Sequence, residues 1–171
     1  MVSTDTPVAE RWVQFWANHF CVAATKGTTL ALVWPHELEA IRPHALANFK
    51  DLLRAAVLHP AMLLYLDNAQ SIGPDSPAGR RRDKGLNENL ARELLELHTL
   101  GVNGGYTQQD VTQTARLLTG WSLPPQAGGQ VQFVARLHQP GNKVVMGKAY
   151  SEGPQALDDL LFDLSQHPAC A

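Results

Sequence analysis

Apolar residues recur every three or four positions along most of the chain, which is the period of amphipathic α-helices. The first such segment follows Thr6-Pro7, a polar residue and a proline of the kind found at helix starts. Its apolar side is mostly aromatic, and we expect it to be buried. Helices are predicted at about 7–24, 43–58, 60–66, 87–100, 108–119 and 154–166.

The period changes from helical to alternating after residue 121. Val131, Phe133 and Leu137 alternate with mostly polar neighbours, and a second short segment from Lys143 to Lys148 follows a Pro-Gly-Asn turn. These segments predict one small β-hairpin at about 130–148. The fold class is therefore mainly α, a helical domain with a small hairpin.

A length of 171 residues suits a single domain with one core. The last predicted helix carries a leucine stripe that needs a partner surface, and His167-Pro168 resembles the start of a further helix. We therefore expect residues 1–171 to be a single partial domain, a fragment of a longer protein.

Composition excludes several classes of protein. The formal net charge of −2 gives no reason to expect a nucleic-acid partner, because such proteins usually present a basic surface. No apolar run approaches the roughly 18 residues that a transmembrane helix needs. Two cysteines, Cys21 and Cys170, are too few to define a disulfide framework or a zinc site, and we expect Cys21 to lie near the surface.

The predicted helix 87–100 combines a set of leucines with two asparagines, four charged residues and a histidine. At 100° per residue, Leu86, Leu90, Leu94 and Leu97 share one face, which we expect to be the core face. The remaining positions divide into an outer stripe, a boundary pair and a flanking histidine. They are Glu88, Arg92 and Glu96 in the stripe, Asn89 and Glu93 at the boundary, and His98 beside the leucines.

Two interpretations of this helix stay open. The stripe fits a solvated face, with Asn87 as the N-cap and Glu88 placed favourably before Arg92. Alternatively, Asn89, Glu93 and Arg92 form a buried or cleft-lining network with Asp67 and Asn68, since a buried carboxylate requires partners. The spacing does not favour a metal site, and no phosphate loop, dinucleotide fingerprint or nucleophile elbow indicates a cofactor or a reaction.

Four motifs carry a resemblance to a known family. The longest, "GLNENLARELLELHTLGVNGGYTQQDVTQTARLLTGW", begins at Gly85, and "FWANHF", "HPAMLLYLDNAQS" and "HQPGNKVVMG" begin at residues 15, 59 and 138. Together they resemble a bacterial family catalogued only as domain of unknown function 1800. The resemblance implies a longer, often exported protein, frequently encoded beside a sulfatase-like protein that could be its partner.

The resemblance also implies which polar positions matter. Two departures from the family pattern are Ala17, where a histidine is usual, and Gln139, where an aspartate is usual. They weaken a ligand role for His19 and could impair an enzymatic site. The family's typical polar positions correspond to Asn18, His19, Asp67, Asn68, Asn87, Glu88, Asn89, Arg92, Glu93, Glu96, His98, Tyr106, Thr107 and Asp110, with His138 and Lys143 in the last motif.

Two functions follow as hypotheses. In the first, the polar helix is an internal packing network in a module that binds a partner. In the second, the protein is a hydrolase that uses Glu93 with Asn89, Arg92 and Asp67 in a cleft.

Overall fold

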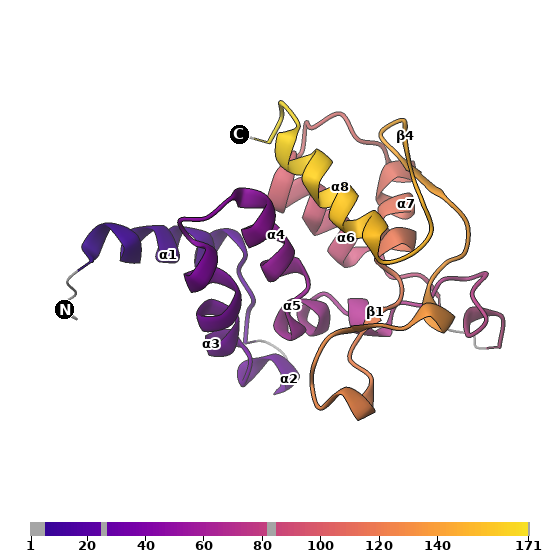
Figure 1. The fold of residues 1–171 in the computed structure, drawn as a ribbon, viewed down its shortest axis with the longest axis horizontal. Helices are drawn as coiled ribbons and strands as arrows, with labels where there is room; N and C mark the ends of the chain where they lie inside the picture. Colours follow the sequence, from indigo (N-terminus) through magenta and orange to yellow (C-terminus); the bar gives the residue numbers. More distant parts are fainter. Residues whose placement is uncertain (1–5, 25–26, 82–84, 171) are drawn as a thin grey trace.

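The computed structural model describes residues 6–24, 27–81 and 85–170 and is mainly helical (Figure 1). Three of the longer helices share the core, and shorter helices and turns connect them and add further buried residues. The helices are α1 (Pro7–His19), α2 (Gly27–Leu30), α3 (Val33–Pro35), α4 (Phe49–Val57), α5 (Pro60–Tyr65), α6 (Asn89–Glu93), α7 (Gln108–Leu118) and α8 (Gln155–Gln166). Two wider π-type turns are η1 (His36–Ile41) and η5 (Leu94–Thr99). Short 3₁₀ turns are η2 (Arg42–His44), η3 (Asn68–Gln70), η4 (Gly79–Arg81), η6 (Pro125–Ala127) and η7 (Ala135–Leu137).

The core lies where α8 crosses between α4 and α7 (Figure 1). The predicted leucine stripe of α8 is buried there, with Leu157 and Leu161 fully inside. Leu53 of α4 and Leu118 of α7 are also fully buried, so these three helices share one apolar interior. Among the described residues, no helix has the length and apolar character to span a bilayer.

Helix α1 is shorter than the expected 7–24 and less buried. It ends at His19, because Phe20 and Val22 are both buried and a helix would point residues two apart to different sides. The prediction of a fully buried aromatic face is wrong: Trp12 is 45% exposed and Phe15 is 53% exposed. Figure 1 shows why, since α1 lies along one edge and projects beyond α3 and α4.

The second predicted helix, 43–58, is divided into two pieces. Pro43 belongs to the short turn η2, and α4 begins only at Phe49. Asn48 takes the N-cap position in an extended conformation, which interrupts the helix between them. The sequence signal for this start was the asparagine, which favours N-cap positions.

The helix predicted at 87–100 changes its winding in the middle. After α6, the N–H of Leu100 bonds to the carbonyl of Leu95, five residues back, as in a π-helix. The wider turn rotates later residues relative to a regular α-helix. Consequently Leu95 and His98 are buried, and Leu97, predicted in the core, is 57% exposed.

The strands form two small antiparallel pairs rather than one hairpin over 130–148. β1 (Trp121–Ser122) pairs with β2 (Gln132–Phe133), and β3 (Lys143–Val145) pairs with β4 (Lys148–Tyr150). The turn between β3 and β4 is Met146-Gly147, and both residues have positive φ, as a tight two-residue hairpin turn requires. A small hairpin is thus present at 143–150, but the segment at 132–133 has a different partner.

Candidate functional site

A hydrogen-bonded cluster joins the start of α6 to α7, and we call it the Glu88 network: Glu88, Arg92, Gln108 and Thr112. The Glu88 carboxylate accepts from Thr112 Oγ1 at 2.7 Å and from Gln108 Nε2 at 2.8 Å. Arg92 donates to Gln108 Oε1 at 2.8 Å and makes a longer contact of 3.5 Å with Glu88. All four side chains are at least partly exposed, so the network clamps two helices at the rim of the core.

The neighbouring asparagines fix where α6 begins. Asn87 Oδ1 accepts from the N–H of Asn89 at 2.9 Å, and the N–H of Asn87 donates to Ser71 Oγ at 3.0 Å. The helix starts at Asn89, so Glu88 rather than Asn87 takes the formal N-cap position, although Asn87 still supplies a capping oxygen. Asn89 itself is exposed, unlike the boundary position expected for it.

The other acidic residues of this helix face an edge shared with Tyr106. Burial raises the pKa of Glu93, and the nearby charge of Glu96 raises it further, while Arg92 lowers it. Burial and Glu96 likewise raise the pKa of Tyr106. Glu93 and Glu96 are half-buried, so like charges lie together here rather than a matched acid and base pair.

Asp67 and Asn68 lie in the turn after α5. The Asn68 amide is buried and donates to the carbonyls of Leu118 and Trp121, both at 3.3 Å, so it holds the end of α7 against β1. Asp67 has a left-handed backbone with φ of 60°. Asn68 therefore serves the junction of α7 and β1.

Thr107 and Asp110 form a capping box at the start of α7. Asp110 also accepts from the N–H of Met146 at 2.6 Å, which ties the β3–β4 turn to this helix. These hydrogen bonds lower the pKa of Asp110 although partial burial acts in the opposite direction.

His98 lies on the opposite side of the same helical segment, beside α1. The ring is 5% exposed, and its Nδ1 is buried without a hydrogen-bond partner in the described part of the chain. Burial, then the neighbouring His19 and His36, lowers the pKa of His98 to about 4, so the ring is neutral at pH 7. His19 Nε2 lies 3.1 Å from the carbonyl oxygen of His98 and donates to it, while Asn18 is exposed.

These two histidines line a pocket of about 350 Å³, which we call the aromatic pocket. Three aromatic rings form most of its wall, and hydroxyl, thiol and imidazole groups supply the polar atoms. Its lining residues are Phe15, Trp16, His19, Phe49, His98, Thr99, Ser165 and Cys170. A mostly apolar pocket with few polar groups is typical of binding sites. Within the described residues, no group of three potential metal ligands is placed to hold a metal ion.

His138 and Lys143 form a separate buried clasp near β3. Lys143 is only 1% exposed, and its ammonium group contacts His138 Nε2 at 2.9 Å, the Gly141 carbonyl at 2.7 Å and the Gln139 carbonyl. His138 Nδ1 donates to the Thr119 carbonyl at 2.6 Å. Burial lowers the pKa of Lys143 to about 8. All three ammonium hydrogens therefore have acceptors, which indicates a structural clamp on the 138–143 loop.

A comparison with protein-family models gives a match that covers the whole chain. The model described as "Protein of unknown function (DUF1800)" matches residues 1–171. The chain belongs to the DUF1800 family. No curated protein and no solved structure matches it.

The two departures from the DUF1800 pattern have visible structural settings. Gln139 accepts from the N–H of Asp75 at 3.0 Å and donates to its carboxylate at 2.8 Å, so the amide fills a position that holds two loops together. Ala17 is half-buried on α1 and adds no side-chain donor beside His19. Gln139 thus has a defined packing role in this chain.

Several residues of these clusters were not among the sequence candidates. Gln108 and Thr112 complete the Glu88 network, and Thr119 completes the clasp through its carbonyl and its hydroxyl, which accepts from the Gln139 N–H at 2.8 Å. The four-residue step from Gln108 to Thr112 was the available signal, because it places both on one side of α7. Buried His36 and His59 carry no such periodic signal.

Proposed function

We propose that this chain is a non-enzymatic module that binds a protein partner through α1, on a scaffold that the Glu88 network holds together. The observation that carries the proposal is an exposed apolar stripe on α1, formed by Val8, Trp12 and Phe15. These residues are 68%, 45% and 53% exposed. Large aromatic side chains are enriched in protein interfaces, and contiguous exposed ones indicate binding surfaces.

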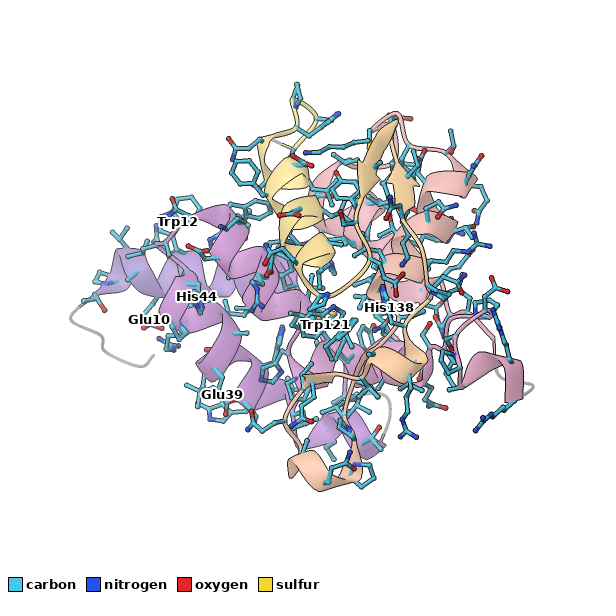
Figure 2. The ribbon with its side chains drawn as sticks, turned by 45° about the vertical axis from the view of Figure 1, so that its right-hand side comes forward. Glu10, Trp12, Glu39, His44, Trp121 and His138 are labelled. Atoms are coloured by element: carbon cyan, nitrogen blue, oxygen red, sulfur yellow. The ribbon has the colours of Figure 1, made fainter. Side chains whose placement is uncertain are left out.

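The geometry of the stripe favours a protein over a small molecule. Val8, Trp12 and Phe15 are spaced by four and three residues, so they share one side of α1 along roughly 10 Å of helix axis. The stripe runs into the aromatic pocket at Phe15, and we expect one bulky apolar side chain of the partner to enter it. Figure 2 shows Trp12 on the projecting end of the molecule, away from Trp121 and His138.

The polar helix contributes to this function as a scaffold. The Glu88 network ties α6 to α7, and the π-type turn that follows presents His98 to the aromatic pocket. The contacts of Asn68 and the exposure of Asn89 favour this packing role over a hydrolase built on Glu93 with Asp67 in a cleft.

The first partner to test is the sulfatase-like protein that the family resemblance implies, with both full-length proteins produced in an exported form. The wild type is expected to bind it, and Trp12→Ala is expected to weaken binding by about 30-fold, the size of an interface hot spot of roughly 2 kcal/mol. Trp34→Ala is the matched control, because Trp34 is also exposed, at 62%. Unchanged affinity in Trp12→Ala and Phe15→Ala, or no binding by the wild type, contradicts the proposal.

A further inference from the structure

A second pocket of about 420 Å³ lies between α4, α5 and the loop that joins β1 to β2. It shares no lining residue with the aromatic pocket and has no role in the proposed function. Its volume is within the range of small-molecule sites, about 300–1,000 Å³. Glu39 and Trp121, both labelled in Figure 2, line it from different segments.

His59 directs an unsatisfied donor at this pocket. Its Nδ1 accepts from the N–H of Ala61 at 3.1 Å, so the neutral ring carries its proton on Nε2. That Nε2 lies 3.5 Å from Glu39 Oε2, which is too long for a good hydrogen bond. His59 is only 7% exposed, whereas the Glu39 side chain is 70% exposed. The buried N–H of His59 at the pocket wall is therefore left without a close acceptor among the described residues.

The other lining residues include polar and apolar side chains. Arg54 lines the pocket and donates from Nε to Asp158 at 2.5 Å, and the exposed Gln130, which also lines it, carries both an amide donor and an acceptor. Trp121 supplies an indole ring whose Nε1 has no partner within the described residues. Leu58 and Val131 complete the apolar part.

We propose that this pocket binds a neutral sugar. Each sugar hydroxyl both donates and accepts, which matches neighbouring His59, Glu39 and Gln130, and the apolar face of a sugar ring matches the indole of Trp121. An anion is disfavoured by the Glu39 carboxylate, because the nearby positive charge of Arg54 is already paired with Asp158. A purely apolar ligand would leave the His59 N–H unpaired.

The test is an NMR titration of the whole chain. It follows the indole N–H signal of Trp121, which is assigned from its absence in Trp121→Phe. The probes are neutral hexoses, pentoses and disaccharides, with glucuronate as the anionic comparison. His59→Asn removes the Nε2 donor and keeps an N-cap side chain for α5. Gln130→Ala removes a lining group, and Gln126→Ala changes an exposed glutamine of the same loop that does not line the pocket.

The expected result is a saturable shift with at least one neutral sugar, weakened about tenfold in His59→Asn and in Gln130→Ala and unchanged in Gln126→Ala. If His59→Asn fails to fold, Gln130→Ala alone decides. The proposal is overturned by no saturable shift with any neutral sugar, by binding of glucuronate alone, or by affinity unchanged in the folded lining variants. The partner-binding variants on α1 leave this titration unaffected, so the two proposals fail separately.

Discussion

The hydroxyl group of Thr112 donates a 2.7 Å hydrogen bond to Oε1 of Glu88, and this bond connects α7 to the residue before α6. The sequence alone is compatible with a Glu88 side chain in solvent. In the structure this side chain instead contacts α7. Hydrogen bonds to charged groups contribute more than neutral ones, although partial exposure reduces the gain.

A double-mutant cycle with Glu88→Ala and Thr112→Val measures this contact. We expect a coupling free energy of about 1 kcal/mol in urea unfolding, because the residues bond directly. Thr28→Val, at an exposed threonine of α2, is the control and should change stability by less than about 0.5 kcal/mol. Additive effects of Glu88→Ala and Thr112→Val would show that the bond contributes nothing.

The buried histidines predict a loss of stability in mild acid. Burial lowers the pKa of His98 and of His36 to about 4, below the unfolded value of 6.5, so the unfolded chain binds more protons between these values. The free energy of unfolding should therefore fall as pH decreases from 6.5 towards 4. The raised pKa of Glu93 acts in the opposite direction, but it is common to wild type and His98→Gln.

His98→Gln should flatten this pH dependence, measured by urea unfolding at several pH values between 7.5 and 4.5. The amide does not titrate, so the contribution of His98 disappears while that of His36 remains. Parallel curves for the two proteins would refute a buried neutral His98.

The π-type turn predicts opposite outcomes for two leucines that lie two residues apart. Leu95→Ala should cost about 2–5 kcal/mol, because Leu95 is fully buried and a cavity remains. Leu97→Ala should cost less than about 0.5 kcal/mol, because Leu97 is 57% exposed. A regular α-helix gives the reverse order, so the two melting curves distinguish the windings.

We expect Lys143 to contribute more to the free energy of unfolding than an exposed lysine does. Lys143→Met leaves buried acceptors at His138 Nε2 and the Gln139 carbonyl without a donor, and we expect a loss of about 2 kcal/mol. Lys50→Met, at a lysine with 44% of its side chain exposed, should lose less than about 0.5 kcal/mol. Equal effects in chemical denaturation would argue against the clasp.

The periodicity of apolar residues predicted most of the helices but not where each helix begins and ends. The capping box of Thr107 and Asp110 and the leucine stripe of α8 follow local rules, and the structure contains both. The π-type winding after Glu93 brings Leu95 and His98 into the interior, and no local sequence pattern encodes it. The hairpin turn was missed because Met146 takes a positive φ that usually belongs to glycine or asparagine.

The candidate site was predicted in part. The sequence identified Glu88, Arg92 and His98 as unusual, but one helix cannot show which neighbouring elements its side chains meet. Gln108 lies 20 residues from Glu88, and His19 lies 79 residues from His98. The exposure of Trp12 and Phe15 is likewise a property of how α1 sits at the edge of the fold, since the same pattern describes a buried helix.

The central claim is that the Glu88 network supports the fold while the α1 stripe binds the partner. The most direct test measures stability and partner affinity in one variant of each feature. Melting temperature and partner Kd are determined for Glu88→Gln and Trp12→Ser, with Kd measured where both variants are folded. We predict that Glu88→Gln lowers the melting temperature and leaves Kd unchanged, and that Trp12→Ser raises Kd about 30-fold at an almost unchanged melting temperature. A raised Kd in Glu88→Gln together with an unchanged Kd in Trp12→Ser would contradict the claim.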